Sequence, residues 1–209
     1  MIPVNVLAVR FLANASPGLC RALGIPAGFP SLAMFTTDCD DATYIALDAA
    51  TKSAEVEVAY AHSFYAGAAN ASTPNAGEVI GILAARTPGA AKSGMEAALS
   101  ALNRLGFEET GGVPYLAHTV SSVGSYLAKE AGISAGSALA YLIAPPLESM
   151  YAMDAALKAA DVRLCKLYAP PSETNFGGGL LTGTQSACSA ACAAFAEAVA
   201  EVATRPVIS

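Results

Sequence analysis

Two stretches of the chain read almost alike: residues 46–56 are ALDAATKSAEV and residues 152–162 are AMDAALKAADV. Upstream of each, GIPAG at residues 24–28 matches GISAG at residues 132–136. Both matches have nearly the same spacing, which indicates a tandem duplication of one unit of about 105 residues. The polar, glycine-rich stretch 106–112 is typical of a linker. We therefore predict two domains, residues 1–107 and 108–209.

Each copy alternates strand patterns with helix patterns. In the first copy, residues 4–12, 32–36, 55–59 and 78–84 have the composition or the alternation of strands. Ser16-Pro17 and Thr87-Pro88 are typical helix starts, and Asp40-Asp41 offers an N-cap to an alanine-rich helix ending near Ser53. The second copy reads the same way. The predicted fold class is α/β (α+β), with two tandem ferredoxin-like domains of four strands and three helices each.

The composition excludes several classes of protein. Of the 209 residues, 54% are hydrophobic, which is too many for a disordered chain. A net charge of −6 argues against nucleic acid or anionic membranes as partners, because both attract basic surfaces. The N-terminus lacks the pattern of a secretory signal. The uncharged stretch 174–196 contains too many Gly, Ser, Thr and Asn residues for a membrane span, so we expect no membrane partner.

No pattern of catalytic or metal-binding residues stands out. The two histidines, His62 and His118, fall in different copies, and HExxH, CxxC, GxSxG and P-loop motifs are absent. Cys188 and Cys192 are four residues apart in an alanine-rich segment, where buried thiols are expected rather than metal ligands. Cys39 lies between two aspartates, and we expect it to be exposed. We expect no enzyme activity, no metal and no cofactor.

Acidic residues gather where the second strand meets the following helix. Asp38, Asp40 and Asp41 lie together in the sequence, and Glu78 opens a strand that the sheet can bring beside them. One acid suffices to cap a helix, so the surplus points equally to a site for a cation or an amine. The glycine run 177–179 lacks the rest of a phosphate-binding loop, and we expect it to lie in a loop that bends or moves.

Several of these segments resemble a known family. The repeated DAAxKxA[D/E]V pattern resembles the signature helix of bacterial microcompartment shell domains. Further segments resemble the two-domain shell proteins of ethanolamine-utilisation microcompartments, the EutL type, and the match runs in order along nearly the whole chain. These segments are residues 40–41, 44–52, 65–68, 124–127, 141–148, 170–175 and 181–183.

The resemblance implies an assembly. Each chain would contain two circularly permuted shell domains, and three chains would form a flat pseudohexameric tile that packs edge to edge with other shell proteins. Lys52 and Lys158 match the edge lysine of the signature helix. The shell would lie in the cytoplasm and enclose enzymes that degrade ethanolamine. Loops at the three-fold axis would open and close a central pore; on this pattern they contain Phe64, Tyr65, Ala66, Gly67, Asn70, Asn175, Phe176 and Gly177.

The resemblance also implies a binding site for a small amine such as ethanolamine, at small pores between the two domains, where binding favours the closed state. Asp40 and Glu78 would hold the ammonium group through charge-assisted hydrogen bonds. Phe107 would offer a cation–π face, and Thr182 and Gly183 would add backbone or hydroxyl contacts.

The sequence departs from the family in a few places, and two other interpretations stay open. The linker after Phe107 is shorter than in the family, His62 replaces an expected arginine, and Ser122-Val123 replaces an expected Arg-Thr. A shell paralogue that serves a different substrate fits these departures. A soluble regulatory protein with two small-ligand-binding domains is the alternative outside the family.

Overall fold

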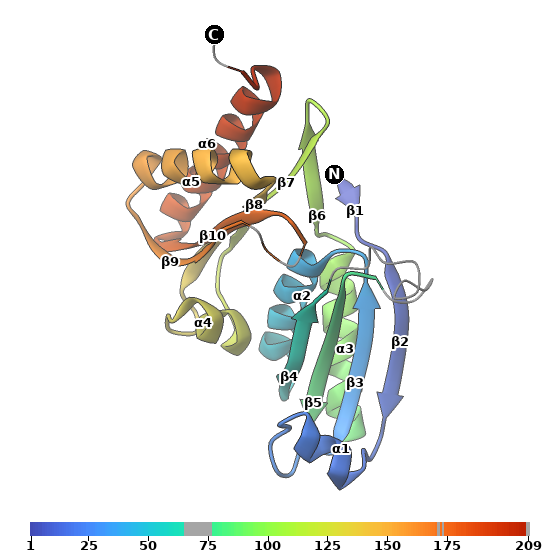
Figure 1. Cartoon of the computed structure of the whole chain (residues 1–209). Helices are drawn as coiled ribbons and strands as arrows, with labels where there is room; N and C mark the ends of the chain where they lie inside the picture. The colour runs from blue at the N-terminus through green and yellow to red at the C-terminus, as the bar shows by residue number, and fades with distance from the viewer. Residues whose placement is uncertain (65–76, 171, 173, 208–209) are drawn as a thin grey trace. The chain divides into compact units, whose positions relative to one another are not determined.

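The chain forms two compact units (Figure 1). The structure is a computed structural model of the whole chain, and it describes residues 1–64, 77–170, 172 and 174–207. The N-terminal unit comprises Pro3–Leu105 and Gly124–Leu127, and the C-terminal unit comprises Met1–Ile2, Gly106–Val123 and Ala128–Ser209. Along the chain the main change of unit falls between Leu105 and Gly106, two residues before the predicted boundary.

The N-terminal unit has a four-stranded antiparallel sheet in the order β2-β3-β5-β4. Its strands are β2 (Val6–Leu12), β3 (Ser31–Thr37), β4 (Val56–Ser63) and β5 (Val79–Ala85). Its helices are α1 (Pro17–Ala22), α2 (Asp40–Ser53) and α3 (Pro88–Leu102). The predicted caps of two helices are confirmed: Ser16 accepts from the Leu19 N–H, and Thr87 accepts from the Ala90 N–H.

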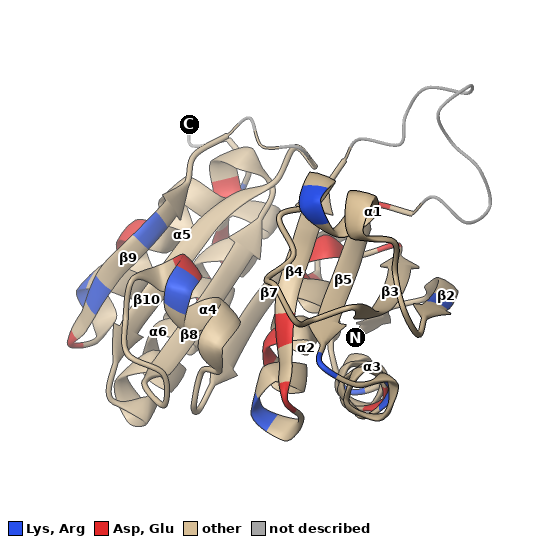
Figure 2. Cartoon of the chain, turned by 90° about the horizontal axis from the view of Figure 1, so that it is seen from below, with Lys and Arg blue, Asp and Glu red and all other residues tan. Residues whose placement is uncertain are grey.

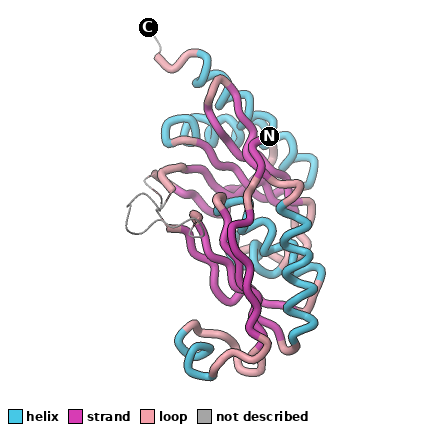
Figure 3. The backbone as a smooth tube through the Cα atoms, turned by 90° about the vertical axis from the view of Figure 1, so that its right-hand side faces the viewer, coloured by secondary structure: helices cyan, strands magenta, loops and turns pink. Residues whose placement is uncertain are grey.

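Alternation along the strands divides the core of this unit between the two faces of the sheet. Helices α2 and α3 pack side by side on one face, where a Cβ at Gly81 would lie within 3.2 Å of Leu47 and Phe35. Helix α1 and its flanking residues cover one end of the other face. There Leu32, Ile82 and Ala84 are buried. Figure 3 shows the helices beside the strands in the side view.

The C-terminal unit repeats this plan and adds strands at one edge. Its sheet has the order β1-β6-β7-β8-β10-β9. Helices α5 and α6 pack together, and α6 contacts β7 and β8. The elements are β1 (Ile2–Pro3), β6 (Gly106–Thr110), β7 (Val113–Val120), α4 (Ser125–Ala131), β8 (Ala138–Ala144), α5 (Pro146–Ala159), β9 (Val162–Tyr168), β10 (Gly177–Gly183) and α6 (Gln185–Thr204).

The local geometry of the two copies agrees closely, as the duplication predicts. Gly24 and Gly132 have φ of 66° and 63°, and Gly28 and Gly136 have φ of 87° and 89°. These left-handed conformations favour glycine, which explains why all four glycines recur. The predicted fold class, mixed α/β units with antiparallel sheets, is confirmed.

Three sequence-based expectations were wrong in detail. The stretch 106–112 is a β-hairpin and not a linker, because β6 pairs with β7 around Gly111-Gly112, both with positive φ. The glycine run 177–179 lies in buried strand β10 and not in a loop. Helix α2 has Cys39 as its N-cap, with no side-chain cap hydrogen bond, so neither Asp40 nor Asp41 serves as the cap.

Helix α6 is the one helix, among the residues that the structure describes, long and apolar enough to cross a membrane by length and composition alone. A core helix of a soluble protein passes the same test, so this is weak evidence. Its buried residues follow helical spacing and belong to the core of the C-terminal unit; they are Cys188, Ala191, Cys192, Phe195, Ala198 and Val199. Figure 2 shows most of the ribbon in tan, as expected when only 13% of residues are charged.

Candidate functional site

Asp40 and Glu78 come from adjacent segments of the N-terminal unit. The Glu78 N–H donates to the Thr37 carbonyl oxygen at 2.8 Å, and this bond places Glu78 beside the end of β3, close to where α2 begins. Asp40 is the first residue of α2 and is 8% exposed. The sheet therefore brings the predicted acidic residues together, although they are 38 positions apart in the sequence.

The charges of this acidic group repel one another. Burial raises the pKa of Glu78, and the neighbouring carboxylates of Asp40 and Asp38 raise it further. Asp38 is bound on one side, because it accepts hydrogen bonds from the backbone and the side-chain nitrogen of Asn5, both at 2.7 Å. One oxygen of Asp40 accepts the Asp41 N–H at 2.8 Å. A bound cation would relieve the repulsion between Asp40 and Glu78.

Cys39 is less exposed than the sequence predicted. Its side chain is partly buried, and burial raises the pKa of its thiol far above the ordinary value, with Asp41, Asp40 and Glu78 adding to the shift. The thiol is therefore protonated at neutral pH and is a poor nucleophile. Among the described residues, no group of three or more His, Cys, Asp and Glu side chains is arranged to hold a metal ion.

Phe107 lies in the C-terminal unit, on β6, beside Phe176. Their ring centroids are 5.8 Å apart with an interplanar angle of 56°. Phe176 and Asn175 directly precede β10, and Asn175 has φ of 65°. Gly177, predicted in the same loop, is the first residue of β10 and pairs with Ala144.

Thr182 and Gly183 lie at the far end of the same strand. Thr182 pairs with Leu139, and its hydroxyl donates to the Ala138 carbonyl oxygen at 2.7 Å. Six residues of a strand separate Phe176 from Thr182, which is roughly 20 Å. Within one chain the structure therefore does not bring Thr182 or Gly183 to Phe107, so these predicted residues do not form one cluster in this unit.

The other predicted pore loop is described only at its start. Phe64 follows β4, and its N–H donates to the Glu78 carbonyl oxygen at 2.9 Å. This contact ties the start of the loop to the acidic group. Tyr65, Ala66, Gly67 and Asn70 lie outside the described residues.

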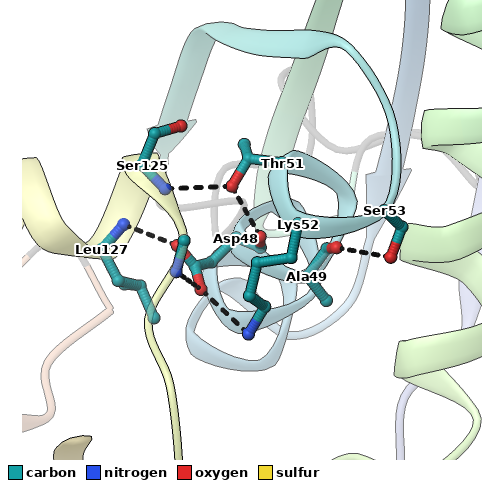
Figure 4. A network of polar contacts seen from close by, with 8 residues as sticks. Asp48, Ala49, Thr51, Lys52, Ser53, Ser125 and Leu127 are labelled. Carbon is teal, nitrogen blue, oxygen red and sulfur yellow. Dashed lines mark hydrogen bonds and ion pairs between the residues drawn. The ribbon is translucent and has the colours of Figure 1, made fainter. Parts of the chain in front are cut away.

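Asp48 is the polar residue whose role the sequence did not reveal (Figure 4). An aspartate with a lysine four residues later is typical of an ion pair on a helix surface, but Asp48 is 0% exposed. Its carboxylate accepts the N–H groups of Gly124 at 2.7 Å and Leu127 at 2.9 Å, and Lys52 lies 3.3 Å away. Thr51 accepts the Ser125 N–H at 3.1 Å. Helix α2 therefore binds the backbone that begins α4.

Gly124 is required for this contact. A Cβ there would collide with the Thr51 hydroxyl and would lie 2.7 Å from the Asp48 carbonyl oxygen. The only feature of the sequence that pointed to this contact was the pair Gly124-Ser125 ahead of a helix. In the second copy, the counterpart pair Asp154–Lys158 is a surface ion pair, with side chains 63% and 74% exposed.

Comparison with known proteins gives the same family as the resemblance found in the sequence. The BMC domain model matches residues 31–113. The bacterial microcompartment shell protein EutL of Clostridium perfringens is 57% identical over 99% of this chain and 97% of its own length. The Salmonella typhimurium EutL is 46% identical over 99% and 96%. The crystal structure of the ethanolamine utilization protein EutL from Leptotrichia buccalis superposes with a TM-score of 0.95, at 57% identity, covering 100% of this chain and 98% of that one. The chain belongs to the EutL family of bacterial microcompartment shell proteins.

Proposed function

We propose that three copies of this chain form a flat, pseudohexameric tile of a microcompartment shell, with a gated pore at its centre. As an EutL-type shell protein the chain is structural and not an enzyme, and its place is the shell. The observation that supports the tile most directly is the presence of two like α/β units in one chain, with matching strand orders and turns. Three such chains supply six like units, which suits a closed ring.

The pore proposal rests on the two loops that follow β4 and precede β10. The first begins at Phe64, and its other proposed members, Tyr65, Ala66, Gly67 and Asn70, lie outside the described residues. The second contains Asn175 and Phe176. In a symmetric tile, equivalent loops gather around the axis, where a change in their conformation changes the width of the pore. Gly177 anchors the second loop to β10.

The amine proposal rests on Asp40 and Glu78. The mutually repelling carboxylates of buried Asp40 and more exposed Glu78 attract a small organic cation such as ethanolamine more strongly than a neutral aldehyde. Phe107 is retained as the proposed aromatic contact. Thr182 and Gly183 stay proposed backbone or hydroxyl contacts; within its own unit the Thr182 hydroxyl donates to the Ala138 carbonyl oxygen and lies far from Phe107. Phe64 links this site to the first pore loop through its bond to Glu78.

The edge lysines remain part of the proposal. Lys158 is 74% exposed and pairs with Asp154 at the surface, where its side chain can also pack against a neighbouring tile. Lys52 lies beside the buried Asp48, so its ammonium group also balances that charge. Edge-to-edge packing with other shell proteins would build the layer.

Two measurements test these proposals separately. Electron microscopy of the purified protein at high concentration should show flat three-fold discs in layers, and dispersed monomers or dimers would contradict the tile. Calorimetric titration with ethanolamine tests the amine site. Asp40→Asn should weaken binding at least tenfold, since one charge-assisted hydrogen bond is lost. Asp161→Asn, an exposed acid of the C-terminal unit, is the control, and an unchanged affinity in Asp40→Asn would exclude the site.

A further inference from the structure

The end of β4 is bonded to the helix that carries Asp40. Ser63 is the last residue of β4, and its hydroxyl forms a hydrogen bond with the hydroxyl of Tyr44 on α2. Tyr44 follows Asp40 by four residues, so the two side chains lie on the same side of α2. The Tyr44 ring packs beside the ring of Tyr126, with centroids 6.2 Å apart. The Tyr44 hydroxyl is therefore held in place beside the end of β4.

The residue after Ser63 extends this connection to Glu78. The Phe64 N–H donates to the Glu78 carbonyl oxygen at 2.9 Å, and the Glu78 N–H donates to the Thr37 carbonyl oxygen at 2.8 Å. Thr37 is joined to α2, because its hydroxyl forms a hydrogen bond of 2.7 Å with the hydroxyl of Thr43. The backbone of Glu78 is therefore held between the end of β4 and the first turn of α2.

The second copy of the repeat shows the same corner without an acidic pair. The bulges in β4 and β9 fall at equivalent positions, so the alignment of the signature helices extends through these strands. Pro146 stands at the position of Asp40. Phe176 stands at the position of Glu78, since each of them directly precedes the strand that pairs next to the bulge, β10 or β5. Both carboxylates are thus replaced by apolar groups in the second copy.

The groups that hold Glu78 are replaced as well. In the second copy Met150 stands at the position of Tyr44, Ala169 at that of Ser63, and Pro170, which has no N–H, at that of Phe64. The Phe176 carbonyl oxygen, which is the counterpart of the Glu78 carbonyl oxygen, accepts a hydrogen bond from the Ser172 hydroxyl at 2.6 Å. The C-terminal unit therefore satisfies this carbonyl group in a different way.

The turn into the last strand is the same in both copies. Gly77 and Asn175 stand at equivalent positions, and both have φ of 65°. The turn therefore forms with the Tyr44–Ser63 hydrogen bond and without it. The two hydroxyls and the two carboxylates occur together in the first copy, and the second copy has apolar side chains at all four positions. This joint occurrence indicates that Tyr44 and Ser63 serve the acidic pair and not the fold.

We propose that Tyr44 and Ser63 are positioning residues of the amine site: their hydrogen bond keeps Glu78 close enough to the first turn of α2 for one ammonium group to reach both carboxylates. This inference rests on the amine site proposed above. Repulsion between the carboxylates of Asp40 and Glu78 favours their separation. The Tyr44–Ser63 bond and the Phe64 amide bond oppose that separation, so the site is preorganised before the amine enters.

Calorimetric titration of the full chain with ethanolamine tests this role. Tyr44→Phe removes the hydroxyl and keeps the ring, and it should raise the dissociation constant about three- to tenfold, as expected for the loss of one neutral hydrogen bond. Ser63→Ala should have an effect of the same size, and the double variant should bind no more weakly than either single variant, because all three lack the same bond. Ser63→Thr keeps a hydroxyl and should bind like the wild-type chain. The control is Tyr60→Phe, which removes a hydroxyl from the same strand on the opposite face of the sheet and should leave the affinity unchanged.

Two further measurements distinguish positioning from a general loss of structure. In a Glu78→Gln background, Tyr44→Phe should change the affinity by less than about twofold, because the carboxylate that Tyr44 positions is already absent. In hydrogen exchange, Tyr44→Phe should speed the exchange of the Phe64 amide, whereas the amides within β5 should keep their wild-type protection. A general loss of structure would weaken binding in both backgrounds and would also expose the β5 amides.

The outcomes separate this inference from the amine site itself. If the wild-type chain does not bind ethanolamine, both proposals fail. If the wild-type chain binds and Tyr44→Phe and Ser63→Ala bind equally well, the positioning role is excluded while the amine site stands. Equal losses with and without the Glu78 carboxylate, or a Phe64 amide that exchanges at the wild-type rate while the affinity falls, would also exclude it. Should Tyr44→Phe fail to fold, Ser63→Ala and Ser63→Thr at the strand end decide the question by themselves.

Discussion

Removal of the Asp48 carboxylate should destabilise the N-terminal unit severely. The side chain is fully buried and accepts two amide hydrogen bonds, at 2.7 and 2.9 Å. A hydrogen bond to a charged group contributes about 1.5–3 kcal/mol, so Asp48→Ala should cost about 3–6 kcal/mol. This is a large fraction of the 5–15 kcal/mol by which domains are usually stable.

Asp48→Asn removes the negative charge but keeps the size and shape of the side chain. The asparagine oxygen can still accept one N–H, but its amide group faces the second donor and cannot accept it. About half of the cost, roughly 2–3 kcal/mol, should therefore remain. The matched control is Glu96→Ala, which breaks an exposed ion pair with Lys92 at the same i, i+4 spacing and should cost less than about 0.5 kcal/mol.

Urea unfolding and hydrogen exchange together measure this effect. Urea unfolding gives the free-energy changes, provided that all variants are compared in the same state of assembly. Hydrogen exchange reports the cause, because the Gly124 and Leu127 amides should lose protection before the rest of the unit. If the free energy of unfolding of Asp48→Ala lies within about 1 kcal/mol of the wild-type value, or if these two amides stay protected, the Asp48 carboxylate is not what holds the start of α4 to α2.

Two further substitutions test the electrostatic and backbone arguments. The native state raises the pKa of Glu78 above its ordinary 4.5, so its ionisation destabilises the fold as pH rises through that raised value. Glu78→Gln should therefore raise the urea midpoint at pH 7 but not at pH 4; equal gains at both values, or an equal gain in the exposed control Glu57→Gln, would contradict this. Gly178 has φ of 147°, and a Cβ there would collide with the Leu142 carbonyl oxygen, so Gly178→Ala should cost about 3 kcal/mol or more. Gly89→Ala, in open space on α3, should be neutral or slightly stabilising in the same thermal melts, and similar losses in both variants would refute the argument.

Local signals predicted much of the fold. Helix starts at Ser16-Pro17 and Thr87-Pro88 were correct because a cap and its helix are neighbours in sequence. The hairpin at residues 106–112 was missed although Gly-Gly between two strand patterns is a hairpin signal. Strand β10 was missed for a different reason. Its glycines have low strand propensity, and what fixes them is the close approach of β8 and of Pro170, which local sequence does not reveal.

The candidate site was predictable in part. The grouping of Asp40 with Glu78 follows from antiparallel pairing of β3 with β5, which hydrophobic patterns can suggest. The different surroundings of Asp48 and Asp154 could not be predicted from the helix alone, because both have a lysine four residues later. The partner that buries Asp48 lies 76 residues away, so only tertiary structure separates the two aspartates.

The contrast between these aspartates shows how one duplicated side chain comes to play two different parts. Asp48 meets its partner within one chain, where the covalent connection keeps the effective concentration high and independent of the protein concentration. Asp154 forms an exposed ion pair with Lys158, and such pairs contribute little to stability. Asp48→Ala should therefore lower the free energy of unfolding severely, whereas Asp154→Ala should lower it by less than about 0.5 kcal/mol. Equal losses in the two variants, measured by urea unfolding, would show that burial and the two amide hydrogen bonds are not what distinguishes Asp48.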